Sequence, residues 1–462
     1  MRAMNPLLHD AALRASRYLA GLDDRPVHPG ADAVTRLAEL DRPMPEHPQP
    51  ADVVLRQLDD LGSPATMASA GGRFFGFVVG GALPVSVAAN WLATAWDQNA
   101  AGPAAAPGTA AFELAALRWL LDLLDLPRDA AGAFVSGTTM GNLCALAAAR
   151  HAVLERAGWD VEADGLFGAP PITMVVGAEA HPTLFKALGV LGLGRSRVVT
   201  VPVDGQGRMR AERLPRLNGP SIVCVQAGNV NTGAFDPFAE LCEQAHCDGA
   251  WVHVDGAFGL WAQAAPAQRH LCAGVNLADS WATDAHKWLN VPYDSGLAFV
   301  RDANALRAAM SVTAAYLPAS GGARAASDFT PELSRRARGV DVWAALSALG
   351  RSGVAALVER CCAHARRFAQ GLRAAGFEVL NEVVLNQVLV RFGDAQATRD
   401  VIDALQADGT CWCGLTQWQG QVAMRISVSS WATTDADVER SLAVIVRLAN
   451  GRASERRPPQ SQ

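Results

Sequence analysis

Two stretches of the sequence decide the fold: Ala250-Trp-Val-His-Val-Asp255-Gly-Ala257 and Ser280-Trp-Ala-Thr-Asp-Ala-His-Lys287-Trp. Each contains a short, mostly apolar segment of the length of a buried β-strand, and polar residues follow that segment. Five similar segments lie at 133–136, 172–176, 197–201, 221–226 and 296–300, and helix-like stretches separate most of them. Short apolar strands alternating with helices predict an α/β domain with a mostly parallel seven-stranded sheet, covered on both faces.

The polar residues after these two strands are the first candidates for chemistry, because ligands of parallel sheets bind at the carboxyl ends of the strands. Asp255 directly follows the apolar run, and Lys287 follows the strand predicted at 280–283. Of 40 basic residues only two are lysines, and the other, Lys186, lies in a helical stretch where an exposed position is expected. Arginine stays charged in proteins, so chemistry that needs a side-chain amine has these two candidates, and position favours Lys287.

An acid and a lysine at one sheet edge suit an aldehyde cofactor with a pyridine ring. The lysine amine can form an imine with the aldehyde, and a pyridinium nitrogen supplies the cation that a buried Asp255 requires. By itself, an Asp-Gly pair after a strand is as often a turn or a metal ligand.

Two further segments fit a flat, phosphorylated ligand. Small hydroxyl residues and glycines in Ser136-Gly-Thr138-Thr139-Met-Gly-Asn142 join the first strand to a helix, where free N–H groups could bind a phosphate. An ordinary helix N-cap is the alternative reading. His181 follows the strand at 172–176 and could stack on a ring, although a loop histidine without a ligand has the same pattern.

Taken together, these motifs resemble the group II pyridoxal-5'-phosphate (PLP)-dependent amino-acid decarboxylases, such as the glutamate and aromatic-L-amino-acid decarboxylases. The resemblance runs from about Gly72 to Thr434 and includes Arg338-Gly-Val-Asp-Val-Trp and Met424-Arg425-Ile-Ser-Val-Ser. It implies the PLP-dependent transferase fold type I, with a large seven-stranded domain and a small C-terminal α/β domain. It also implies an obligate homodimer with the site at the subunit boundary.

The resemblance assigns roles to individual residues. It implies that Lys287 forms the Schiff base with PLP, that Asp255 pairs with the pyridine nitrogen, and that Ala257 and His181 lie on the two faces of the ring. The residues implied to hold the phosphate are Thr138 and Thr139, with help from Ser280 and His286.

The substrate side is less defined. Arg425 resembles an arginine that binds a substrate carboxylate, and a surface or dimer salt bridge is the alternative. The stretch that begins at Asn99, Asn-Ala-Ala-Gly-Pro-Ala-Ala-Ala-Pro, has small apolar residues where the glutamate enzymes have bulkier polar ones. It favours an apolar or aromatic substrate side chain. Trp96, Trp412 and Trp418 could line such a pocket or belong to the core.

The implied reaction removes the α-carboxylate of an amino acid as CO2 and leaves an amine. Other reactions of the same fold stay open: aldehyde-forming oxidative decarboxylation, a carbon–carbon lyase or aldolase reaction, and aminotransfer. A non-catalytic binding or regulatory homologue is a third possibility, against which the intact Lys287, Asp255 and His181 argue. The aromatic enzymes return a proton from a loop tyrosine, but residues 318–331 contain none. We therefore expect Tyr316, His181 or water to return it.

Composition limits the partners and the compartment. The net charge is −5 with acids and bases interspersed, so neither nucleic acid nor a membrane surface is expected. Residues 74–96 carry no charge and could raise the question of a membrane span, but their glycines and proline predict a loop and a buried helix. The nine cysteines are poorly spaced for metal, and their odd number argues against a disulfide framework, so a cytoplasmic location and no metal site are expected.

The predicted organisation has four parts: an N-terminal helical segment (1–75), a large PLP-binding domain (76–335), a small domain (336–450) and a disordered tail (451–462). The small domain is expected to contain a long helix at 340–375, strands at 377–380, 387–392 and 422–428, and helices at 395–407 and 435–449.

Overall fold

The computed structural model describes residues 5–312 and 324–455, with side chains up to residue 451. The described chain forms two compact units. The larger comprises Ala82–Ala365 and Asn381–Gln387. The smaller comprises the residues up to Gly81, Arg366–Leu380 and the residues from Val388 on.

The large unit is built on a seven-stranded sheet in the order β1-β7-β6-β5-β4-β2-β3. Its strands are β1 (Ala131–Val135), β2 (Thr173–Gly177), β3 (Val199–Val201), β4 (Ser221–Gln226), β5 (Trp251–Asp255), β6 (Ser280–Asp284) and β7 (Gly296–Val300). Only β7 runs antiparallel to its neighbours β1 and β6. The predicted fold class, with seven strands in a mostly parallel sheet, is confirmed.

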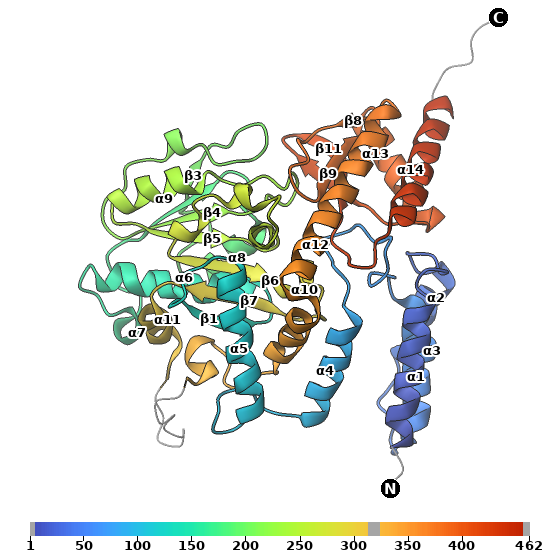
Figure 1. The fold of residues 1–462 in the computed structure, drawn as a ribbon, viewed down its shortest axis with the longest axis horizontal. Helices are drawn as coiled ribbons and strands as arrows, with labels where there is room; N and C mark the ends of the chain where they lie inside the picture. Colours follow the sequence, from blue (N-terminus) through green and yellow to red (C-terminus); the bar gives the residue numbers. More distant parts are fainter. Residues whose placement is uncertain (1–4, 313–323, 456–462) are drawn as a thin grey trace, which may run out of the picture. The chain divides into compact units, whose positions relative to one another are not determined.

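Both faces of this sheet are buried (Figure 1). Side chains of a strand alternate between faces, and Val135, Val176 and Ile222 belong to one core with the helices that cover that face. Their neighbours Phe134 and Val175 point the other way and are also buried. These strands therefore read as continuous apolar runs.

Helices occupy the connections of the large unit. They are α4 (Pro84–Trp96), α5 (Pro107–Leu123), α6 (Thr138–Glu155), α7 (Val161–Asp164), α8 (Pro182–Val190), α9 (Phe238–Cys247), α10 (Ala285–Trp288), α11 (Ala303–Met310) and the first part of α12 (Arg338–Ala374). Short 3-10 helices are η2 (Ala211–Arg213), η3 (Gly259–Ala264), η4 (Arg269–Cys272), η5 (Val275–Leu277) and η6 (Ala326–Phe329).

Helix α6 positions the site, because it begins directly after β1 and lies against the sheet. Most of its residues are buried, and alanines fill its middle. A Cβ atom on Gly141 would lie 2.8 Å from the carbonyl oxygen of Leu297 in β7, so only glycine allows this close approach. The helix N-terminus is thereby held at the carboxyl ends of the parallel strands.

The small unit combines the two ends of the chain. It contains α1 (Pro6–Ala20), α2 (Ala31–Arg36), η1 (Leu37–Leu40), α3 (Ala51–Ala65), the rest of α12, α13 (Ala395–Asp408) and α14 (Asp435–Glu455). Its sheet has the order β10-β11-β9-β8, with β8 (Glu378–Val379), β9 (Gln387–Arg391), β10 (Gly414–Trp418) and β11 (Gln421–Ser427).

The division of the chain differs from the predicted one. The N-terminal segment is not separate, because the N–H of Val27 donates to the carbonyl of Gly409 at 2.8 Å and Phe74 stacks on Trp412 at 5.0 Å. The predicted boundary at 335/336 lies near the start of α12, whereas the units divide within that helix, at 365/366. Helix α14 continues to Glu455, beyond the predicted start of the tail. Strand β10 was not predicted.

The uncharged stretch 74–96 forms a loop and the 13-residue α4, as expected for its glycines and proline. The expectation that this helix is buried is wrong, because Ser86 is its only buried residue. Within the described chain, α12 alone is long and apolar enough to cross a membrane, a test that core helices also pass. Gly350 interrupts α12 with a φ of +59°.

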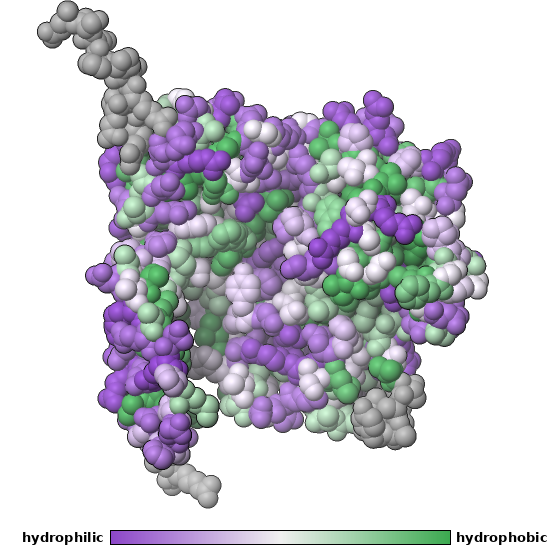
Figure 2. Space-filling model, turned by 180° about the vertical axis from the view of Figure 1, so that it is seen from behind, coloured by the Kyte–Doolittle hydropathy of each residue, from purple (hydrophilic) through white to green (hydrophobic). Residues whose placement is uncertain are grey.

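The surface of the chain is mixed. In the view of Figure 2, hydrophilic residues predominate along the N-terminal helices, and hydrophobic residues form patches on the large unit.

Candidate active site

The two stretches that decided the fold meet at one edge of the large sheet. Asp255 ends β5 and Asp284 ends the neighbouring parallel strand β6. Two backbone hydrogen bonds of 2.9 Å join the loop after β5 to the end of β6: Gly256 N–H to Ala282 O, and Asp284 N–H to Ala257 O. Lys287 lies in α10, immediately beyond β6. The prediction that Asp255 and Lys287 share a sheet edge is confirmed.

Asp255 is a buried carboxylate, 5% exposed, that only neutral groups contact. Its Oδ2 accepts from Asn142 Nδ2 at 3.1 Å, and its Oδ1 accepts from the N–H of Ala257 at 3.3 Å. It forms no ion pair with any residue that the structure describes. A buried charge requires a cationic partner, so the site fits a ligand that brings a positive charge, such as a pyridinium nitrogen.

Lys287 has a partner that the sequence reasoning missed. Its Nζ lies 2.9 Å from Oδ2 of Asp284, a carboxylate that is almost fully buried. Asp284 Oδ1 accepts the N–H of Thr138 at 2.6 Å, so the same side chain joins the lysine to the start of α6. The spacing of three residues within a helical turn was the available signal. Lys186 is exposed on α8, as expected.

His286 lies between Asp284 and the loop that leads to β7. The N–H of Ser295 donates to its Nδ1 at 3.1 Å, and its Nε2 lies 3.6 Å from Asp284 Oδ1. Burial lowers the pKa of His286, against the opposing effect of Asp284. The ring stacks on Tyr293, with centroids 4.2 Å apart.

The N-terminus of α6 carries a free donor. Thr138 is buried, and its Oγ1 has no hydrogen-bond partner among the described residues. Gly137 precedes it, and a Cβ atom there would lie 3.3 Å from the His286 ring. Thr139 follows in the same turn and is half-buried. Helix N–H groups, the helix dipole and an unpaired hydroxyl fit a phosphate.

Ser280 is not part of this cradle, and the prediction that it helps to hold the phosphate is wrong. It begins β6, whereas the cradle lies beyond the end of that strand. Its side chain is fully buried between Trp251 Nε1, at 2.8 Å, and His253 Nδ1, at 2.9 Å. The resemblance supplied the residue type but not the end of the strand at which it lies.

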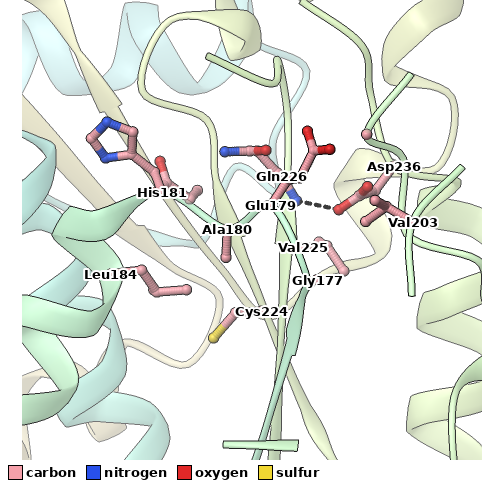
Figure 3. Close-up of a pocket in the computed structure, with 12 residues that line it drawn as sticks. Gly177, Glu179, Ala180, His181, Leu184, Val203, Cys224, Val225, Gln226 and Asp236 are labelled. Carbon is pink, nitrogen blue, oxygen red and sulfur yellow. Dashed lines mark hydrogen bonds between the residues drawn. The ribbon is translucent and has the colours of Figure 1, made fainter. Parts of the chain in front are cut away.

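His181 lines the same cavity as Asp255. It is the N-cap of α8, and its Nδ1 lies 2.7 Å from the hydroxyl of Thr183 and accepts the Thr183 N–H at 3.3 Å. Because Nδ1 accepts, a neutral ring carries its proton on Nε2. Figure 3 shows the imidazole on one side of the cavity and Asp236 on the other. Burial raises the pKa of Asp236 to about 6.

The profile of the pyridoxal-dependent decarboxylase conserved domain matches residues 35–392 of this chain. The chain belongs to the pyridoxal-dependent decarboxylase family. Tryptophan decarboxylase 1 of Oryza sativa subsp. japonica is 27% identical over 92% of this decarboxylase and 89% of its own length. L-2,4-diaminobutyrate decarboxylase of Rhizobium meliloti (strain 1021) is 30% identical over 91% of this chain and 83% of its own.

A solved structure agrees on the fold. The crystal structure of Oryza sativa TDC with PLP and tryptamine superposes with a TM-score of 0.89, at 24% identity, over 98% of this decarboxylase and 99% of that chain. The decarboxylase is therefore a PLP-dependent carboxy-lyase that converts an amino acid to an amine and CO2. Asp255, Lys287 and the α6 N-terminus fit this cofactor.

The predicted substrate residues of the decarboxylase lie in different units. Asn99 Oδ1 accepts the N–H of Arg335 at 2.9 Å, and Asn99 lines a cavity of about 520 Å³ together with Tyr293 and Arg338. Arg425 lies on β11 of the small unit, where burial lowers its pKa. Both roles stay predictions. Tyr316 lies outside the described residues.

Three tryptophans were candidates for a substrate pocket, and two of them pack against other residues of the small unit. Trp412 stacks on Phe74, and Trp418 belongs to a small buried cluster in the small unit. Trp96 is 42% exposed and stacks on Phe112. Core packing was the alternative for these residues, and the structure supports it for Trp412 and Trp418.

Proposed function

We propose that this decarboxylase acts in the cytoplasm as a homodimer on an amino acid with an apolar or aromatic side chain, with Lys287, Asp255 and His181 at its catalytic centre. The observation that carries the site assignment is the buried Asp255 carboxylate. It lacks a cation among the described residues and lies at the same sheet edge as Lys287.

When bound, PLP supplies an aldehyde for the amine and a ring that accepts electrons from the substrate α-carbon. Asp255 holds positive charge at the ring nitrogen, while Thr138 and the α6 N-terminus bind the phosphate. His181 covers one face of the site. Asp284 Oδ2 lies 2.9 Å from Lys287 Nζ and would keep the lysine side chain beside the cofactor.

The proton that returns to the substrate α-carbon has two candidate side chains. His181 can carry a proton only on Nε2 while its Nδ1 accepts the Thr183 N–H, so Nε2 is the atom that would donate. Tyr316 and water are the other candidates. A site that returns this proton slowly would leave the α-carbon open to oxidation by O2, which would give aldehyde, ammonia and hydrogen peroxide beside the amine.

Small apolar residues support the substrate class. The segment from Asn99 to Pro107 carries alanines, glycine and prolines. Such residues leave room for a large side chain and offer no charge to bind an acidic one.

An exposed aromatic row supports the homodimer. Four aromatic rings on α4, α5 and α12 form a row in which each ring contacts the next, with centroids 4.8 to 6.3 Å apart. In their order in space they are Trp96, Phe112, Trp343 and Trp119. Trp96 and Trp119 are 42% and 43% exposed, and Leu92 on α4 is 56% exposed. An apolar patch of this kind is typical of a protein interface.

The compartment proposal rests on the cysteines. None of the nine cysteines is in a disulfide bond and eight of them are buried, which suits a reducing environment.

The test of the proposed reaction is a panel of amino acids with the purified, PLP-loaded protein, monitored for CO2 and for amine. We expect one amine per CO2, with aromatic or large apolar amino acids preferred. A preference for glutamate or aspartate would contradict the substrate class. An aldehyde as the main product would indicate the oxidative reaction instead.

The test of the dimer is the molar mass of the wild type and of Trp119→Arg by light scattering. We expect a dimer for the wild type and a monomer for the variant. Lys186→Ala, which replaces an exposed residue on a different helix, α8, is the control. A monomeric wild type would contradict the proposal.

A further inference from the structure

A series of hydrogen-bonded, buried side chains ends at Asp255. The other members of this series have no role in the mechanism proposed above. Trp251 Nε1 lies 2.8 Å from Ser280 Oγ, which lies 2.9 Å from His253 Nδ1. His253 Nε2 lies 2.9 Å from Asn142 Oδ1, and Asn142 Nδ2 lies 3.1 Å from Asp255 Oδ2. We call this series of four hydrogen bonds the Trp251–Asp255 relay.

The relay crosses the interior of the large unit. Ser280, His253 and Asn142 are each fully buried, and Trp251 is 5% exposed. Burying this many polar atoms costs stability unless every one has a partner. The relay supplies these partners, and it connects β5, β6 and α6 beneath the site.

The direction of each hydrogen bond is fixed. An indole N–H can only donate and an ionised carboxylate can only accept. Asn142 therefore donates its amide to Asp255 and accepts at Oδ1, so His253 must carry its proton on Nε2. Burial lowers the pKa of His253 to about 3, which keeps the ring neutral and leaves Nδ1 to accept from Ser280. All donors thus point towards Asp255.

We propose that Asn142, His253 and Ser280 are positioning residues that hold the Asp255 carboxylate ionised and aimed at the ring nitrogen of the cofactor. A hydrogen bond to the charged form of an acid favours that form, and bonds aligned in one direction strengthen one another. Loss of the relay lets the shared proton move from the ring nitrogen to Asp255. The ring then accepts electrons less well.

An amide flip of Asn142 would also be unfavourable. If Asn142 turned its oxygen towards Asp255, two acceptors would face each other, and that contact would be repulsive. Asp255 therefore holds Asn142 in its donating orientation, which leaves Asn142 Oδ1 to accept from His253 Nε2.

The experiment compares breaking and conservative variants in enzyme loaded with PLP that is 15N-labelled at the ring nitrogen. His253→Phe and Asn142→Leu remove the relay. His253→Gln can keep one donor and one acceptor at similar separation. The 15N chemical shift reports whether the ring nitrogen carries a proton, and kcat and KM are measured in parallel.

We expect His253→Phe and Asn142→Leu to move the 15N signal towards that of the neutral ring and to lower kcat by about 10- to 100-fold, the size of a lost hydrogen bond to a charged group. KM should change little. His253→Gln should keep most of the wild-type kcat and a 15N shift close to that of the wild type. Ser280→Ala should act in the same direction but more weakly. A lower kcat in all variants with an unchanged 15N shift would overturn the proposal and leave a purely structural role.

This inference rests on the proposed pairing of Asp255 with the ring nitrogen, and the two can fail separately. If Asp255→Asn keeps the ring protonated and active, the pairing itself is wrong. If Asp255→Asn abolishes both but the relay variants keep wild-type signals, only the relay proposal is wrong.

Discussion

Replacement of Asp255 by asparagine removes one negative charge and almost no volume. The amide oxygen can still accept one of the two hydrogen bonds that now reach the carboxylate, from the Ala257 N–H at 3.3 Å or from Asn142 Nδ2 at 3.1 Å. Its NH2 group faces the other donor as long as Asn142 keeps its donating orientation. The variant therefore loses the charge and one hydrogen bond at a residue that is 5% exposed.

The expected loss follows from the burial of the pair. Removing one partner of a buried ion pair costs about 3–5 kcal/mol. If this cost appears in the transition state, where the ring carries the substrate's electrons, kcat falls by about 150- to 5,000-fold. Lys287, Thr138 and the α6 N-terminus are unchanged, so the variant should still bind PLP.

The assay is single-turnover release of CO2 from saturating substrate, with PLP content measured on the same samples. The matched control is Asp279→Asn, since Asp279 precedes β6 at the opposite edge of the same sheet and bonds to Val252 N–H. It should keep a near-normal rate. A rate within about fivefold of wild type for PLP-loaded Asp255→Asn would refute the reasoning, since a buried partner charge contributes far more.

Three further predictions follow from single contacts. Thr138→Val should weaken PLP binding by about 10- to 100-fold in equilibrium dialysis without destabilising the apoprotein, because the buried hydroxyl has no hydrogen-bond partner among the described residues. Unchanged PLP affinity would contradict this prediction. His181→Gln and Tyr316→Phe should each be compared with wild type for amine and aldehyde per CO2, and we expect the donor's variant to shift product towards aldehyde; identical yields in both would exclude these two side chains. Burial raises the pKa of Asp341 from 3.8 to about 6, so this carboxyl stabilises the fold below pH 4 and loses that contribution as pH rises through 6. The asparagine of Asp341→Asn cannot ionise, so the free energy of unfolding of this variant in urea should exceed that of the wild type by up to about 3 kcal/mol at pH 8 but not at pH 4. An equal difference at both pH values would contradict this prediction.

The sequence predicted the large sheet well because its signal is local. Each strand is a short apolar run bounded by polar or turn residues, and burial on both faces removes any alternation that could confuse the pattern. The position of Asp255 and Lys287 after neighbouring strands then followed from the common direction of parallel strands.

The errors arose where a residue's role depends on distant chain segments. Asp284 resembles an ordinary residue between a strand and a helix until the structure brings the Thr138 N–H to it. Ser280 has the right residue type but begins its strand, so it contacts His253 of the relay and not the phosphate cradle. The N-terminal segment joins the C-terminal part through contacts such as Val27 with Gly409, which no local pattern encodes.

The exposed α4 is a different case. Its apolar residues predicted a buried helix, and apolar periodicity cannot distinguish a protein core from a protein interface. Only the coordinates show that Trp91, Leu92 and Trp96 lie at the surface of the single chain.

The central claim is that Lys287 holds the cofactor, and the two-lysine composition makes it directly testable. Borohydride reduction of the PLP-loaded protein fixes the cofactor to its lysine, and peptide mass spectrometry locates the adduct. We predict one adduct per chain, on Lys287, with full labelling retained in Lys186→Ala and none in Lys287→Ala. An adduct on Lys186, or undiminished labelling and turnover in Lys287→Ala, would contradict the account.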